Sequence, residues 1–128
     1  MNREAEDLWA RAKESLAAAK TVLPVSPDAA ASRAYYAAFH AVAALFAIEG
    51  RSFTKHSAVE AAVHRDLVRT GRWPAELGKL YTRLVALRQT GDYGGGTHVA
   101  ADEAADAITV AERILANVDE NTLKHGLA

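Results

Sequence analysis

The chain has 128 residues, and 50% of them are hydrophobic, which is enough for the core of one domain. It contains no cysteine, which excludes a disulfide framework and thiolate metal sites. The formal net charge of −1 excludes little, but residues 51–90 have a balance of +5 and residues 91–128 a balance of −5. This distribution predicts either an anion-attracting surface or helices of opposite charge that pack side by side.

The first segment, residues 2–22, is charged and has the period of an amphipathic helix. Its expected apolar stripe, with Trp9 and Val22 beside it, consists of Leu8, Ala12, Leu16 and Ala19. The segment lacks the basic-then-apolar order of a signal peptide, so we expect a cytoplasmic protein.

The most apolar stretch is residues 34–48, in which His40 is the only residue outside the hydrophobic set. A helix that is apolar on all sides is typical of the centre of a bundle. It is shorter than the roughly 20 residues that a bilayer requires, so we expect no membrane span. Ser26 and Pro27 mark the start of this central helix, and Gly50 can adopt the left-handed conformation that ends it.

Three further helices are expected at about residues 54–70, 75–90 and 100–119, and Ser52 or Thr54 can cap the first of them. Their apolar stripes are Val59, Ala62 or Val63 and Leu67, then Leu77, Tyr81 and Leu84, then Ala104 or Ala105, Ile108, Ala111 and Leu115. No strand-like alternation appears. The predicted fold is therefore an all-α bundle of five helices in a single domain.

The stripe of the fourth helix ends in a charged residue, because Arg88 follows three apolar residues at the core-facing spacing. A semi-buried guanidinium needs a partner, and Asp92 is one turn further on if the helix continues. One interpretation is a salt bridge that closes the end of the bundle under Tyr93. The other is a phosphate-binding arginine at the rim of a groove, since its fork of donors matches two phosphate oxygens. Residues 91–96 include three consecutive glycines and are expected to be flexible.

The histidines are candidates for proton transfer or metal binding. His40 shares a stripe with Tyr36, where a lone histidine is either a core residue with satisfied nitrogens or a functional group. His56, Glu60 and His64 are one turn apart and need a further ligand from elsewhere to hold a metal, whereas a solvated helix face needs none. We therefore expect no metal and no cofactor.

Three motifs together resemble those of the small stand-alone HEPN-domain proteins of bacteria and archaea. They are residues 32–41 (SRAYYAAFHA), Lys55-His56 and residues 88–93 (RQTGDY). The similarity covers about residues 5–118 in the same helix order, and we expect residues 119–128 to be a frayed tail. The resemblance implies an up-and-down bundle of four or five helices, commonly a homodimer. Such proteins are often encoded beside a minimal nucleotidyltransferase.

Many HEPN domains are metal-independent ribonucleases, with an arginine followed four to six residues later by a histidine. The resemblance implies that Arg88 would hold the scissile phosphate while a histidine moves protons. Here Asp92 stands near the expected histidine position, and His98 comes ten residues after the arginine. In related toxin–antitoxin pairs the nucleotidyltransferase silences the HEPN protein by adenylylating a tyrosine, which Tyr93 could match.

Three functions are compatible with these residues. The first is a HEPN module, the toxin-type partner of a nucleotidyltransferase, that binds the phosphate of a nucleotide or RNA. Its site would be lined by Arg88, Asp92, Tyr93, His40 and Tyr36. The second is an active ribonuclease in which His98 or His40 carries the proton. The third is a structural helical domain without a ligand.

Overall fold

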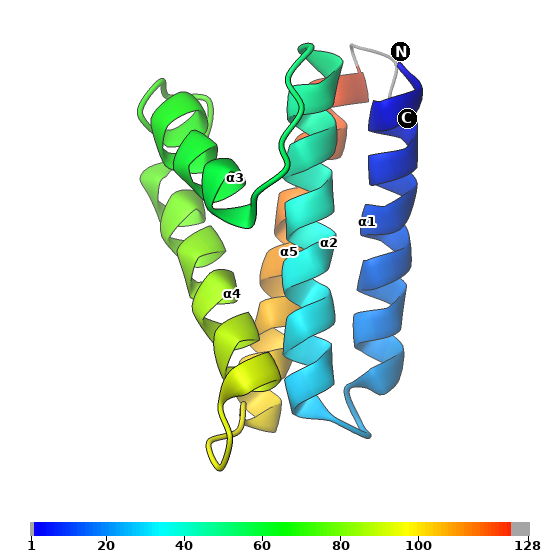
Figure 1. Cartoon of the computed structure of the whole chain (residues 1–128), viewed down its shortest axis with the longest axis vertical. Coiled ribbons are helices and arrows are strands. Elements are labelled where there is room, and N and C mark those ends of the chain that lie inside the picture. The colour runs from blue at the N-terminus through cyan, green and yellow to red at the C-terminus, as the bar shows by residue number, and fades with distance from the viewer. Residues whose placement is uncertain (1, 124–128) are drawn as a thin grey trace.

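The computed structural model describes residues 2–123, which form five α-helices and one π-helical segment, with no strand among them. The long helices of the bundle are α1 (Arg3–Val22), α2 (Pro27–Ile48), α4 (Ala75–Tyr93) and α5 (Ala101–Leu123). The short helix α3 (His56–Ala62) continues directly into the π-helical segment η1 (Val63–Val68), and both lie beside one end of α4 (Figure 1). The predicted all-α bundle is confirmed.

The helix at the centre of the bundle is α2, as the sequence predicts. It contacts α1, α4 and α5, with α1 and α4 on either side and α5 behind it (Figure 1). Ser26 caps its start by accepting a hydrogen bond from the amide of Ala29 at 3.1 Å, and Pro27 occupies the first turn. Gly50 has a φ of +81°, the left-handed conformation expected where the helix ends.

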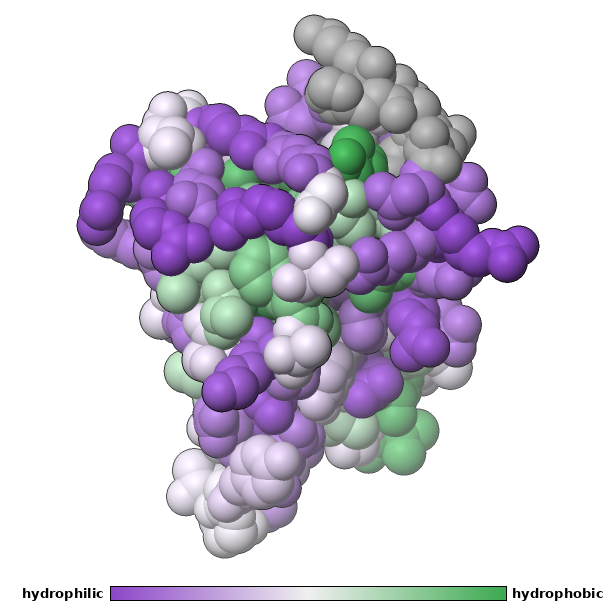
Figure 2. All heavy atoms as spheres, turned by 45° about the horizontal axis from the view of Figure 1, so that its top comes forward, coloured by the Kyte–Doolittle hydropathy of each residue, from purple (hydrophilic) through white to green (hydrophobic). Residues whose placement is uncertain are grey.

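One stripe of α2 remains open to solvent. Arg33 is exposed and Tyr36, Phe39 and His40 are half-buried, whereas every other position from 30 to 47 is buried. Hydrophilic residues cover most of the molecular face seen in Figure 2, with one apolar area at its centre and another at its lower right. The bundle therefore leaves part of its most apolar helix uncovered.

The core face of α1 is rotated from the expected stripe. Its buried residues are Ala5, Trp9, Ala12, Ser15 and Ala19. Leu8 and Leu16, which we expected in the core, are half-buried. The large indole of Trp9 takes the place in the core that we expected for Leu8. The buried face of α1 is therefore centred about one residue further along the sequence, and both leucines lie at its edge.

The third helix begins later than expected, directly after Lys55, which provides no side-chain cap. The predicted cap by Ser52 or Thr54 is wrong, because the Ser52 hydroxyl donates to the carboxylate of Glu4 in α1 at 2.8 Å. The expected continuous α-helix changes after two turns into η1. Such π-helical turns are frequent at functional sites.

The last two helices are longer than expected. Helix α4 continues through Gly91 to Tyr93, so this part of the segment that we expected to be flexible is helical. Helix α5 continues to Leu123, into the expected frayed tail, and the rest of that tail, with His125, lies outside the described residues.

Among the helices that the structure describes, none combines the length and apolar character needed to cross a membrane.

The last turn of α4 lies directly against the start of α2. A Cβ atom added at Gly91 would be 2.6 Å from the backbone carbonyl oxygen of Asp28. Real Cβ atoms do not approach backbone oxygens this closely, so only glycine fits between the two helices here. This contact sets the position of the turn that carries Arg88 and Asp92.

We predict that Gly91→Ala destabilises the fold by about 1–3 kcal/mol, the usual cost of overpacking, because the backbone of Asp28 cannot yield without moving α2. A gain in helix propensity of up to about 1 kcal/mol offsets part of that cost. Urea unfolding followed by circular dichroism measures the difference. Gly96→Ala is the matched control, since no atom of residues 2–123 lies within 4 Å of a Cβ atom there. Equal effects of the two substitutions would contradict the close contact.

Candidate anion-binding site

Arg88 lies at the end of the buried stripe of α4. Leu77, Tyr81 and Leu84 on that stripe are exposed by 1%, 0% and 1%. The side chain of Arg88 is 12% exposed. Burying an unpaired charge is costly, so a guanidinium this deep requires compensating groups. Its surroundings therefore decide what the site can bind.

The ion-pair partner of Arg88 is Asp92, one turn further along α4. The Nε atom of Arg88 lies 3.5 Å from Oδ2 of Asp92, so the expected contact is present. A charge-assisted hydrogen bond spans about 2.7–2.9 Å, so this pair is loose. Nε is buried and has no hydrogen-bond partner among the described residues. Asp92 thus offsets the charge of Arg88 without occupying its donors.

Three tyrosine rings surround the guanidinium of Arg88. Its Cζ atom lies 5.2 Å from the ring centroid of Tyr35, 5.6 Å from that of Tyr36 and 6.0 Å from that of Tyr93. Contacts within about 6 Å are cation–π interactions, worth about 0.5–2 kcal/mol each. The rings therefore stabilise the charge through their faces and leave the guanidinium N–H donors to other partners. Tyr93 is 71% exposed, so this side of the cluster faces solvent.

A cavity of about 240 Å³ adjoins Arg88, between residues of α3 and α4. Its wall consists of Tyr35, His56, Ser57, Glu60, Val85, Arg88 and Gln89. This volume is below the roughly 300–1,000 Å³ of pockets for drug-sized ligands. The cavity therefore suits a group the size of one base or one phosphate.

His56 belongs to this site and is connected to it by a hydrogen bond with Tyr35. The Tyr35 hydroxyl and Nδ1 of His56 are 2.8 Å apart, and the imidazole stacks on Phe39 with 4.3 Å between ring centroids. Burial raises the pKa of Tyr35 to about 12, so its hydroxyl stays protonated at neutral pH. Burial, followed by the charge of Arg88, lowers the pKa of His56. The site thus places a neutral imidazole, which can accept a proton, near a guanidinium.

The structure does not bring His98 to this cavity. Nδ1 of His98 lies 2.7 Å from Oδ2 of Asp28, and the amide of Val99 donates to Oδ1 of the same carboxylate at 2.7 Å. The bond with His98, followed by that from Val99, lowers the pKa of Asp28. These contacts hold the loop after α4 against the start of α2. His98 therefore has a structural role there, outside the cavity.

His40 also lies outside the lining of the cavity, on the open stripe of α2. Its ring centroid is 5.2 Å from that of Phe39 and 6.1 Å from that of Tyr36. Nδ1 is buried without a hydrogen-bond partner in the described part of the chain, so the interpretation as a core histidine with satisfied nitrogens is wrong. Burial lowers the pKa of His40 to about 4, and the nearby charge of Arg11 adds to the shift.

The structure brings together four of the expected site residues: Arg88, Asp92, Tyr36 and Tyr93. Sequence reasoning missed Tyr35 and His56 as members of the site. Both stand in motifs that carry the family resemblance, which is the signal that could have found them. Their hydrogen bond joins α2 to the start of α3, and helical periodicity does not reveal how those two segments meet.

The group of His56, Glu60 and His64 does not form a metal site. Nε2 of His64 lies 2.8 Å from the hydroxyl oxygen of Thr82, and that hydroxyl donates to Glu60 at 3.2 Å. His56 is engaged by Tyr35. Within residues 2–123, no cluster of three or more histidine, aspartate or glutamate side chains is arranged to hold a metal ion.

Ion pairs do not explain the opposite charges of residues 51–90 and 91–128. Between described residues, Arg88–Asp92 is the only pair that joins a basic group of the first segment to an acidic group of the second. Other basic groups of the first segment pair with Glu49 or Asp66. Helices α4 and α5 of the two segments are in contact, but ion pairs between their opposite charges contribute little to that packing.

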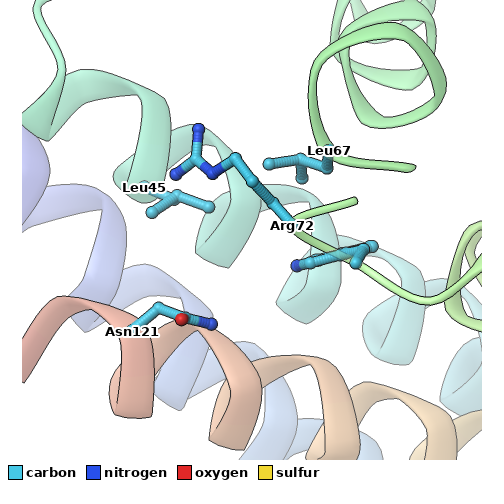
Figure 3. Close-up of a pocket in the computed structure, with 5 residues that line it drawn as sticks. Leu45, Leu67, Arg72 and Asn121 are labelled. Atoms are coloured by element: carbon cyan, nitrogen blue, oxygen red, sulfur yellow. The ribbon is translucent and has the colours of Figure 1, made fainter. Parts of the chain in front are cut away.

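A second, smaller cavity of about 110 Å³ lies near the C-terminal end of α2 and is lined by Leu45, Leu67, Arg72, Trp73 and Asn121. Figure 3 shows Asn121 of α5 facing Leu45 and Arg72 across this space. The guanidinium of Arg72 is already paired with Glu49 at 2.6 Å. The space admits only a few water molecules of about 30 Å³ each. The cavity beside Arg88 is therefore the better candidate for ligand binding.

Comparison with known proteins gives a consistent assignment. The family described as HEPN domain matches residues 5–121. A UPF0332 protein of Thermotoga maritima is 41% identical over 111 residues, covering 86% of this chain and 84% of that protein. "Putative toxin MJ0142" of Methanocaldococcus jannaschii is 31% identical over 103 residues, covering 80% of this chain and 70% of that protein. The crystal structure of TT1696 from Thermus thermophilus matches with a TM-score of 0.76 and 25% identity, covering 94% of this chain and 98% of that one.

We predict that His40 makes the fold less stable as the pH falls from about 6.5 toward 4. The folded state keeps the imidazole neutral, with a pKa of about 4. The unfolded chain binds a proton near the reference pKa of about 6.5. Since the unfolded state binds more protons in this window, the free energy of unfolding decreases as the pH falls.

His40→Leu should remove this part of the pH dependence. Urea unfolding at pH 7 and pH 5 should therefore show a smaller loss of stability in the variant than in the wild type. An NMR titration of the His40 ring provides the direct measurement. Identical pH dependence of both proteins, or an unshifted ring titration, would contradict the burial argument.

Proposed function

Because this chain belongs to the HEPN domain family, we propose that it is a stand-alone HEPN module that binds a phosphate group of a nucleotide or RNA through Arg88. One observation carries the proposal: a guanidinium that is 12% exposed has only a loose ion pair and a buried Nε without a hydrogen-bond partner among the described residues. Buried polar groups of a purely structural residue are normally hydrogen-bonded. An incompletely paired guanidinium in the wall of a cavity therefore supports a ligand.

A phosphate would complete the hydrogen bonds that Asp92 leaves open. The planar fork of Arg88 matches two phosphate oxygens at once, which a lysine cannot do. The exposed ring of Tyr93 offers a face on which a base can stack. Tyr36 and Tyr35 contact the guanidinium from within the bundle and, together with Asp92, orient it before a ligand binds.

We predict that Arg88→Ala weakens the binding of ATP and of a short RNA by roughly 10- to 150-fold, because a charge-assisted contact contributes about 1.5–3 kcal/mol. Arg88→Lys should lose part of the affinity, since an ammonium group lacks the fork. Asp92→Asn should leave the fold mostly intact and loosen the orientation of the arginine. Calorimetric titration at two salt concentrations measures these effects.

The matched control is Arg83→Ala, which removes an exposed arginine of the same helix that does not line the cavity. It should change the affinity much less than Arg88→Ala does. Equal and salt-insensitive binding by wild type and Arg88→Ala would make Arg88 a structural residue and favour a ligand-free domain.

RNA cleavage is a second candidate function, and the neutral imidazole of His56 near Arg88 is the observation that favours it. The RNA from the titration is therefore also analysed for cleavage without metal. Cleavage that is lost in both Arg88→Ala and His56→Asn would assign the ribonuclease activity. Cleavage that depends on His98 or His40 instead would contradict this assignment of the proton carrier.

We also propose a toxin-type role with a minimal nucleotidyltransferase as partner. The resemblance to stand-alone HEPN proteins and the name of the relative from Methanocaldococcus jannaschii support it. Tyr93 is 71% exposed, so a modifying enzyme could reach its hydroxyl. An adjoining nucleotidyltransferase reading frame would support the partnership, and its absence from the gene's surroundings would count against it.

The proposed homodimer would use the open stripe of α2. This stripe combines the half-buried rings of Tyr36, Phe39 and His40 with an unpartnered nitrogen, which a second copy can cover. We predict that sedimentation equilibrium at micromolar concentration shows a species of twice 13.7 kDa. A single 13.7 kDa species would contradict the dimer.

A further inference from the structure

The cavity beside Arg88 also contains a carboxylate, Glu60, that phosphate binding does not require. An anionic ligand confined to the cavity would be repelled by Glu60. A ligand with a phosphate at one end and N–H donors at the other satisfies both groups. Binding of such a ligand rests on the proposed phosphate-binding function and extends it to the other half of the ligand.

Glu60 is held in place by a short hydrogen-bond chain from α4 and η1. The Thr82 hydroxyl donates to Oε2 of Glu60 at 3.2 Å. A hydroxyl has one hydrogen, so the Thr82 oxygen must accept from Nε2–H of His64, which lies 2.8 Å away. The chain orients the carboxylate, and an ionised carboxylate with one such contact retains capacity to accept further hydrogen bonds.

The remaining walls of the cavity suit the flat ring of a base. His56, which is exposed, contributes an aromatic ring and Val85 an apolar side chain, whereas Tyr35, at 1% exposure, is a buried part of the wall. Single-stranded nucleic acids are read by stacking bases on aromatic side chains and by hydrogen bonds to their Watson–Crick edges. A volume of about 240 Å³ accommodates a base more readily than a whole nucleotide, so the phosphate would lie at the rim, with Arg88.

We propose that the cavity binds guanine and that Glu60 determines this specificity. Guanine presents two adjacent donors, N1–H and the 2-amino group, which match the two oxygens of a carboxylate. Uracil presents one N–H between two carbonyl oxygens, which the carboxylate would repel. Adenine and cytosine each place one amino group beside an acceptor nitrogen. Glu60 is therefore complementary to guanine among the four bases.

The test is a calorimetric titration of the full chain with 5′-GMP, 5′-IMP, 5′-AMP and 5′-UMP. Wild type should bind GMP roughly 10-fold or more tightly than UMP or AMP, as expected for hydrogen bonds to a charged group. IMP, which lacks only the 2-amino group, should bind with intermediate affinity. Glu60→Gln should reduce the preference for GMP over UMP to less than about 3-fold without weakening the binding of UMP.

Two further variants separate the roles of the residues. Glu76→Gln removes a charge from α4 outside the cavity lining and should leave the preference unchanged. Thr82→Val removes the positioning hydroxyl and should reduce the preference for GMP while leaving the affinity for UMP as it is. Arg88→Ala should weaken all four nucleotides by a similar factor, because it acts on the phosphate.

The outcomes distinguish this inference from the function on which it rests. Failure of wild type to bind any nucleotide would overturn the proposed phosphate binding. Binding of all four nucleotides with equal affinity would overturn the guanine specificity and leave the phosphate site in place. A preference for GMP that survives Glu60→Gln, in a variant with the circular dichroism of the wild type, would show that another group reads the base.

Discussion

The burial of α2 between three other helices is the constraint on which the structure depends. Its side chains from 30 to 47 are buried except along one stripe, and α1, α4 and α5 are placed by the need to cover them. Completely buried side chains such as Phe46 and Val42 contribute about 1.5–3 kcal/mol each to that driving force. The ends of α2 are fixed locally by the Ser26 cap and by Gly50.

The candidate site is a consequence of this arrangement. Because α2 is central, Tyr35 can contact α3 through His56 and α4 through Arg88 at the same time. One buried ring therefore links the three elements that form the wall of the cavity. Gly91 lets the last turn of α4 approach Asp28 closely, so the charged end of the α4 stripe stays against α2.

The sequence was sufficient for the elements whose patterns are local. The central helix, its cap and the stripe ending at Arg88 follow from the spacing of apolar residues and from turn chemistry. It was insufficient where tertiary contacts outweigh local preference. The Ser52 hydroxyl bonds to Glu4 and does not cap α3. Helix α4 continues through Gly91, which is required by its close packing against α2. The contact between Tyr35 and His56 depends on how α3 meets α2.

Asp92 determines how the charge of Arg88 is balanced in the absence of a ligand. A carboxylate one turn from Arg88 offsets the buried positive charge when no ligand is present, which a neutral histidine would not do. For the proposed phosphate ligand, the carboxylate of Asp92 is a competitor, since the phosphate must displace part of that attraction. The 3.5 Å separation and the three surrounding rings keep this competition weak, because the guanidinium is stabilised without surrendering its donors. A proton carrier, if one acts here, must then come from a different helix, and His56 of α3 is the histidine that the fold places there.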